Sequence, residues 1–134
     1  MPVFLKYGTV TGEAKEPAHR GWVEVTSAQL GAFRRSPSRD RERPDESPSI
    51  TDIVVTKKTD SSSPQLQREA LGGQAVAAVI DFVDDGGSVY IRLELSGTVI
   101  SSWSISSGGA KPSESLTLNF TKIEFKKTPG TPPP

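Results

Sequence analysis

The sequence predicts a mainly β, antiparallel protein, and three observations support that prediction. The run Val89 to Leu95 alternates apolar and polar side chains, the pattern of a strand with one buried face. Two further β-rich runs follow, 98–105 and 114–125, separated by short turn-forming segments. The chain also contains 12 glycines and 11 prolines, which suits many turns better than long helices. We therefore expect an antiparallel meander whose apolar face is covered by the remaining strands.

The last of these runs changes its pattern part of the way along. In 114–125 the apolar residues alternate as far as Phe120 and then take the opposite phase, which a regular strand cannot do. We predict a β-bulge near Thr121 or Lys122 that lets one run serve two surfaces. The residues that we expect in the core are Leu93, Trp103, Leu116, Leu118 and Phe120.

Upstream of the meander the sequence indicates further strands and one helix. We expect the strands over 3–12, 21–31, 50–58 and 74–83. The helix is predicted at about 63–72, where Ser62 or Ser63 can cap it and Pro64 suits its first turn. The glycine pair 72–73 provides a stop signal at its end.

The segment 34–49 has a composition unlike the rest of the chain. Arginines alternate with acidic residues, and three prolines interrupt any regular element, so the segment cannot order itself by burying surface. Composition favours a solvated connection between strands over an arm that becomes ordered on a partner. A nucleic-acid arm is disfavoured because the charges nearly cancel and no aromatic residue is interleaved. The candidate contact residues are Arg34, Arg35, Arg39, Asp40, Arg41, Glu42 and Arg43.

Overall composition excludes several classes of partner and site. The 16 basic and 16 acidic residues give a formal net charge of zero, so no strong field attracts DNA or an acidic membrane. The chain has no cysteine, which rules out disulfides, thiolate nucleophiles and cysteine-based metal sites. We find no signal-peptide pattern over residues 1–8 and no apolar run long enough for membrane insertion.

No group of residues predicts catalysis. His19 lies in a polar segment without an obvious partner, so we expect a surface or turn residue. The pair Asp84 and Asp85 precedes two glycines and indicates an ordinary turn. Trp22 and Trp103 favour packing over a ligand platform. We therefore predict no catalytic residue, no cofactor and no metal site.

Six segments nevertheless occur in the order found in one known family. They are Gly12–Glu13, Ala18–Val25, Val55–Lys58, Ser63–Leu66, Val99–Ser104 and Glu114–Phe125. Together they resemble the haemolysin-coregulated protein (Hcp) family, the inner-tube proteins of the type VI secretion system. The resemblance covers about residues 3–126, and its most specific parts are the last segment and Ser63–Leu66, some fifty residues upstream.

The resemblance implies a fold of two antiparallel sheets forming a compact barrel or sandwich, with the short helix at about 63–72 packed alongside. Residues 1–127 would form one tube domain, and 128–134 a Pro-rich, disordered tail. Six copies would form a ring, and rings would stack into a tube expelled by a contractile sheath. The implied partners are further copies of the chain, sheath, spike and baseplate proteins, and effector cargo, without nucleic acid or membrane insertion. The protein would leave the bacterial cytoplasm without a signal peptide.

The resemblance also assigns two contact regions. The segment 34–49 would reach neighbouring subunits or rings, and the lumen contact with cargo would fall near Gln29. Many relatives continue beyond the position of Phe125 into another strand, whereas here a Pro-rich segment follows and leaves a sheet edge open. The alternative functions are an effector-carrier or adaptor ring without long tubes, and a tail-tube subunit of a phage-derived extracellular injection particle. An enzyme ranks last.

Overall fold

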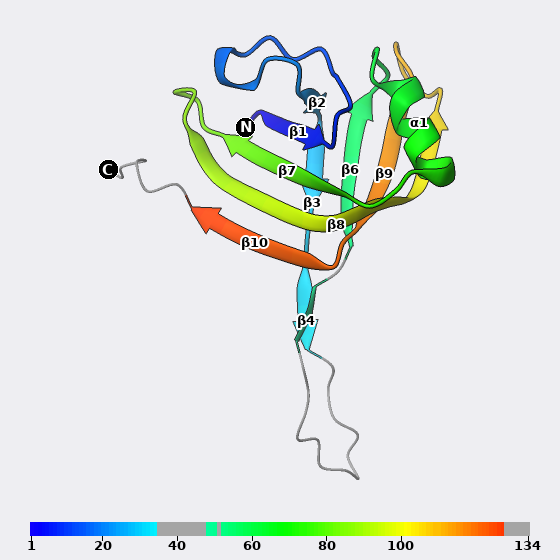
Figure 1. Ribbon diagram of the computed structural model, residues 1–134. Helices are drawn as coiled ribbons and strands as arrows, with labels where there is room; N and C mark the ends of the chain where they lie inside the picture. Colours follow the sequence, from blue (N-terminus) through cyan, green and yellow to red (C-terminus); the bar gives the residue numbers. More distant parts are fainter. Residues whose placement is uncertain (35–47, 51, 128–134) are drawn as a thin grey trace.

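Antiparallel strands dominate the computed structural model, which describes residues 1–34, 48–50 and 52–127 (Figure 1). The strands are β1 (Val3–Tyr7), β2 (Val23–Val25), β3 (Ser27–Gln29), β4 (Ala32–Arg34), β5 (Pro48–Ile50), β6 (Ile53–Lys58), β7 (Val76–Val83), β8 (Val89–Ser106), β9 (Ser113–Asn119) and β10 (Lys122–Lys127). They are joined by a 3-10 turn, η1 (Pro17–His19), and one α-helix, α1 (Ser63–Gly72). The predicted mainly β fold with one short helix is confirmed.

The long strand β8 belongs to two sheets. Its first half pairs with β7 and β10, and its second half pairs with β9. The first sheet has the order β2-β1-β7-β8-β10, and the second continues from β8 through β9 and β6 to β3. The strands at the two ends of this order, β2 and β3, are separated in the chain only by Thr26 and are therefore directly connected. The two sheets therefore close into a barrel.

The bend in β8 lies at Gly97, whose φ is 61°. A Cβ atom at this position would lie 2.4 Å from the hydroxyl oxygen of Thr121, so only glycine fits where the chain crosses β8. A register shift between Ile100 and Ser102 adds a second irregularity in the same strand. The expected runs 89–95 and 98–105 are therefore one bent strand rather than two.

The phase change predicted near Thr121 has a different form from the one expected. Instead of a bulge within one strand, β9 ends at Asn119 and β10 begins at Lys122. The backbone N–H of Thr121 donates to the carbonyl of Ser96 at 3.0 Å and fixes the crossing. Because β9 and β10 follow the two differently directed halves of β8, no single strand can pair with both.

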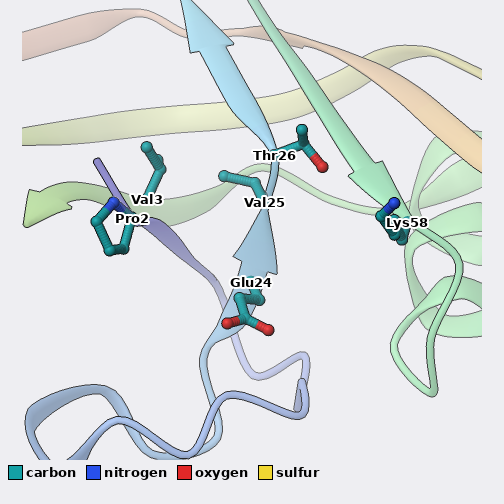
Figure 2. A pocket seen from close by; sticks show the side chains of 6 residues that line it. All are labelled: Pro2, Val3, Glu24, Val25, Thr26 and Lys58. Carbon is teal, nitrogen blue, oxygen red and sulfur yellow. The ribbon is translucent and has the colours of Figure 1, made fainter.

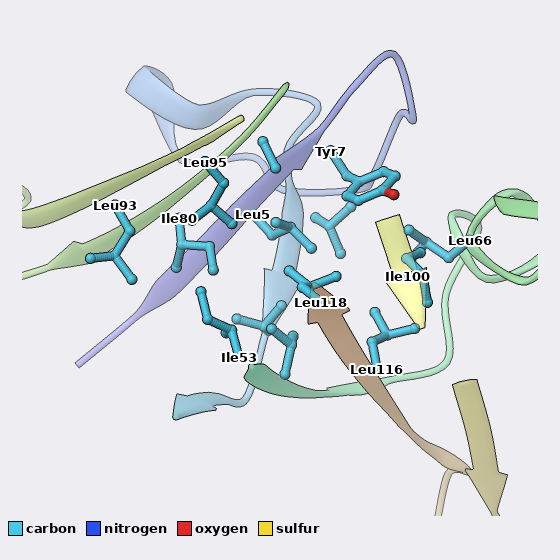
Figure 3. Packing of buried hydrophobic residues seen from close by; sticks show 14 of the residues in the cluster. Leu5, Tyr7, Ile53, Leu66, Ile80, Leu93, Leu95, Ile100, Leu116 and Leu118 are labelled. Carbon is cyan, nitrogen blue, oxygen red and sulfur yellow. The ribbon is translucent and has the colours of Figure 1, made fainter. Parts of the chain in front are cut away.

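The core lies between the two sheets (Figure 3). Leu93, Leu116 and Leu118 are buried in it, and Leu66 of α1 closes one end. Trp103 and Phe120 pack against this core but are only half-buried. Phe120 lies in the connection after β9 and not in a strand, which is why it is less buried than its place in the alternation predicts.

The remaining elements differ from expectation mainly in length. The strand expected over 21–31 is divided into β2 and β3, because its two halves join different sheets. Beyond β3, β4 and β5 form a two-stranded ribbon that extends away from the barrel (Figure 1). Residues 35–47 and the tail 128–134 lie outside the described residues. Among the described residues, no helix is long and apolar enough to cross a membrane.

Tyr7 places an ionisable hydroxyl against the core. Its side chain is buried, and the hydroxyl donates to the carbonyl of Thr98 at 3.2 Å. Burial, together with the negative charge of Glu69, raises the pKa of Tyr7 to about 12. The folded state therefore favours the neutral phenol.

We predict that replacing Leu118 by alanine lowers the free energy of unfolding by about 2–5 kcal/mol, because it opens a cavity between the sheets. Leu71→Ala is the matched control, since the Leu71 side chain is 80% exposed and its truncation should change stability by less than about 0.5 kcal/mol. Chemical denaturation of both variants measures the difference. Equal losses would contradict the assigned core.

We also predict a stability loss at high pH that depends on Tyr7. Because the folded-state pKa lies above the unfolded value of about 10, this contribution is present below pH of about 10 and is lost as the pH rises toward 12. Ultraviolet absorbance should show one tyrosine ionising near pH 12 in the folded protein. The late phase should be absent in Tyr7→Phe; its persistence there would assign it to the other tyrosine.

Candidate functional site

Two clusters of charged side chains are each centred on a fully buried charged residue, and each holds a segment outside the sheets against the barrel. The helix-anchor cluster lies at the start of α1 and consists of Lys57, Asp60, Ser63, Trp103 and Glu114. The loop-anchor cluster lies over the first sheet and consists of Glu16, His19, Asp81 and Arg92. Five of the nine residues belong to the segments on which the family resemblance rests: His19, Lys57, Ser63, Trp103 and Glu114.

The helix-anchor cluster is centred on a lysine with no exposed surface. The Nζ of Lys57 donates to the carbonyl of Lys58 at 2.8 Å, to the Asp60 carboxylate at 3.0 Å and to the Ser63 hydroxyl at 3.3 Å. The carboxylate of Glu114, itself buried, lies 3.7 Å from the same nitrogen. Burying an ammonium group is costly unless it is paired and hydrogen-bonded, and here each requirement is met.

The acidic members of this cluster fix the first turn of α1. Glu114 accepts hydrogen bonds from the hydroxyl of Ser63 and from the indole nitrogen of Trp103, the latter at 3.2 Å. Ser62 occupies the N-cap position, but its side chain does not cap the helix; it donates to Asp60 at 2.6 Å. Burial alone would raise the pKa of Asp60, but the hydrogen bonds from Ser62 and Lys57 hold that pKa below its usual value.

The loop-anchor cluster is centred on Asp81, a fully buried carboxylate of β7. Arg92 of the neighbouring strand donates to both of its oxygens at 2.7 Å, a bidentate pair. The Nε2 of His19 lies 2.7 Å from one of these oxygens, and its Nδ1 lies 2.5 Å from the Glu16 carboxylate. The imidazole also stacks on Phe4, with ring centroids 4.6 Å apart.

His19 was expected to be a surface or turn residue; it lies in the turn η1, but it is not at the surface. Its side chain is 1% exposed, because η1 folds back over the first sheet and places the ring between Phe4 and Trp22. The sequence does contain one local signal, Glu16 three residues earlier, whereas Asp81 is 62 residues away. Both ring nitrogens are occupied and inaccessible to a substrate, so the cluster is built for attachment and not for proton transfer.

Of the other sequence candidates, Asp84 and Gln29 can be located from their surroundings. The Asp84 carboxylate accepts from the backbone N–H groups of Gly86 and Ser88 at 3.0 Å, the turn that the sequence indicated. Gln29 is exposed at the end of β3, and Arg34 ends β4. The other predicted contact residues, Arg35, Arg39, Asp40, Arg41, Glu42 and Arg43, lie outside the described residues.

Gln29 belongs to the neutral face of the second sheet, which we define by two rows of uncharged residues lying between Asp52 and Lys58, the charged residues at either end of β6. Two rows of paired residues cross it, each on the side of the sheet away from the core. They are Gln29–Val54–Thr117–Ser102 and Ser27–Thr56–Ser115–Ser104. This face therefore offers hydroxyl groups and one amide but no charge to a molecule that contacts it.

A small pocket opens where the chain passes from one sheet to the other (Figure 2). Its volume is about 250 Å³, and it is lined by Pro2, Val3, Glu24, Val25, Thr26 and Lys58. It shares no residue with either anchor cluster. In the described part of the chain, no three acidic or histidine side chains are grouped so that they could hold a metal ion.

A family model described as type VI secretion system effector, Hcp, matches residues 4–126. No curated protein matches the chain. Among solved structures, one titled as a type six secretion system protein superposes with a TM-score of 0.83 at 19% identity, over 92% of this chain and 82% of that chain.

Two further structures come from named bacteria. Hcp1 from Salmonella typhimurium has a TM-score of 0.79 at 19% identity and covers 94% of this chain and 85% of its own. A variant of Hcp1 from the E. coli pathovar EAEC 042 has a TM-score of 0.82 at 20% identity, over 97% and 94% of the two chains. Similarity at this identity shows a shared fold, and the family match is independent of it.

We predict that Lys57→Met lowers the free energy of unfolding by about 3–5 kcal/mol, because Glu114 is then buried without its cationic partner. The double variant Lys57→Met, Glu114→Gln should recover part of that loss, since no isolated charge remains. Lys6→Met, an exposed lysine of β1, is the control and should have little effect. If the double variant loses as much as the sum of the single changes, the two charges are not coupled.

Proposed function

This chain belongs to the Hcp family of the type VI secretion system and is a subunit of the secretion tube, and we propose that six copies form each ring of that tube. The observation that supports the ring most is the family match over residues 4–126, together with a fold shared with several Hcp structures. The family is structural and not enzymatic. The occupied, buried state of His19 and Asp81 agrees with that role.

Stacking of rings requires a rigid subunit with elements that project from it. The two anchor clusters supply rigidity, because they attach α1 and the η1 segment to the barrel through charge-assisted hydrogen bonds. The ribbon of β4 and β5 projects and leads into the charged segment 35–47. We propose that this segment contacts a neighbouring subunit or ring, where its arginine and carboxylate side chains pair across the boundary.

The neutral face of the second sheet is the surface that we propose for the lumen. It contains Gln29, the position that the family resemblance assigns to cargo contact, and its paired rows carry hydroxyl groups without charge. A polypeptide cargo that meets such a surface is held by neutral hydrogen bonds, which salt screens little. The remaining proposed partners are sheath, spike and baseplate proteins.

The protein is a secreted component of this system. We propose that it is made in the bacterial cytoplasm and leaves inside the contracting assembly. An effector-carrier ring that builds no long tube, or a tail-tube subunit of an extracellular injection particle, would use the same ring. Electron microscopy of the purified protein distinguishes a carrier ring from a tube, because only the tube stacks.

We predict a hexamer in light scattering at tens of micromolar protein, and stacking that is lost when residues 35–47 are replaced by a short Gly-Ser linker. The melting temperature should stay within a few degrees, since this polar segment cannot support the core. A variant with the same residues in shuffled order controls for length and composition. A particle of single-subunit mass with no rings in microscopy would refute the ring, and unchanged stacking after replacement would show that the segment is only a connection.

A further inference from the structure

We infer that neighbouring copies of this chain join through one defined contact, in which Phe125 of one copy enters the pocket formed by Val3 and Val25 of the next. This inference rests on the proposed ring and names the surfaces that would close it. The partner is a second copy of the chain, and the contact joins two different surfaces of the same molecule.

The exposed aromatic residue lies on a strand that projects from the barrel. Among the described strands, β10 pairs with β8 alone and stands outside the closed order. Phe125 is paired in register with Leu93, a buried core residue, so its side chain extends from the core side of the first sheet. It is nevertheless 64% exposed, because the second sheet does not reach over β10. A large apolar side chain thus extends from the core side of the sheet and stays mostly exposed.

The pocket has a structural origin at the opposite side of the same sheet. Strand β3 pairs with β6, whereas β2, on the other side of Thr26, pairs with β1, and Lys58 lines the pocket between them. The apolar part of the lining is Pro2, Val3 and Val25 (Figure 2). The volume of about 250 Å³ exceeds the roughly 150 Å³ of an apolar cavity that holds benzene. A phenylalanine ring therefore fits.

The positions of the two surfaces suit a closed ring. Strands β2 and β10 are the outermost strands of the first sheet, so four strand spacings, about 19 Å, separate them. A copy therefore cannot place its own Phe125 in its own pocket. Contact between two different surfaces is head-to-tail, and it closes into a ring when the rotation per copy divides a full turn.

Charge favours the same arrangement. Strand β10 carries three lysines, of which Lys122 and Lys126 pair with Glu124 and Glu94 within the same copy. Lys127 has no carboxylate partner among the described residues and lies over the Tyr90 ring. Glu24, exposed at the rim of the pocket, can accept a hydrogen bond from Lys127 of the neighbouring copy. The aromatic ring would supply the buried centre of the contact, and the charged pair its solvent-accessible rim.

The first test compares three proteins by light scattering over a range of concentrations. Phe125→Ala should raise the protein concentration below which rings dissociate. The expected increase is about thirtyfold, the factor for a central contact residue. Leu71→Ala, which removes a more exposed leucine from α1, should leave that concentration unchanged. The free energy of unfolding measured on dilute protein should be the same for all three, since neither side chain contributes to the core.

The second test uses the absence of cysteine from the chain. Thr26→Cys, at the pocket, and Lys127→Cys, at the end of β10, are combined and treated with a short bis-maleimide linker. Denaturing gels should show a ladder of linked copies up to the size of the ring. Each single-cysteine variant should give dimers at most. The linker must be shorter than the separation between the two sites within one copy.

The outcomes separate this contact from the ring itself. If the unaltered protein never exceeds the mass of one subunit, the proposed ring is wrong and the contact fails with it. If rings form but Phe125→Ala leaves their dissociation unchanged, or the double-cysteine rings give no ladder, the ring stands and this contact is overturned. A ladder together with the loss of rings in Phe125→Ala supports the contact.

Discussion

The barrel depends on one constraint, which is that a single strand takes part in two sheets. Strand β8 pairs with β7 and β10 before its bend and with β9 after it. The bend needs a glycine at position 97, because the chain crosses there with no room for a side chain. The same division between two sheets separates β9 from β10, which pair with different halves of β8, and β2 from β3, which pair with β1 and β6. The closed core follows from these divisions.

Charged clusters, and not apolar contacts alone, attach the segments outside the sheets. A buried lysine holds the start of α1, and a buried aspartate holds the η1 segment. Such clusters tolerate little change, because removing one partner leaves a charge buried without compensation. Two of these side chains, Lys57 and His19, belong to the segments on which the family resemblance rests.

The exposed surfaces of the molecule suit a protein that assembles with other copies of itself. The buried charged groups of the described residues already have partners within the fold, so no reactive group is presented to a substrate. What the molecule does present is a projecting ribbon, a neutral sheet face, an overhanging strand and a small pocket with apolar and polar walls. These are features that other copies or cargo can contact. A rigid barrel with such projections suits repeated assembly better than catalysis.

The sequence by itself determined the features that depend on residues close together in the chain, namely strand alternation and the bounds of the helix. The alternation through Leu93 predicted a strand with one buried face, and Pro64 with the following glycine pair predicted α1 within a residue. Tertiary structure alone decided which halves of a strand join which sheet, and so why Phe120 is half-buried and Phe125 is exposed. It also decided the burial of His19, because the carboxylate of Asp81 comes from a strand 62 residues away. Alternation is a local property, whereas sheet membership and charge pairing depend on residues that only folding brings together.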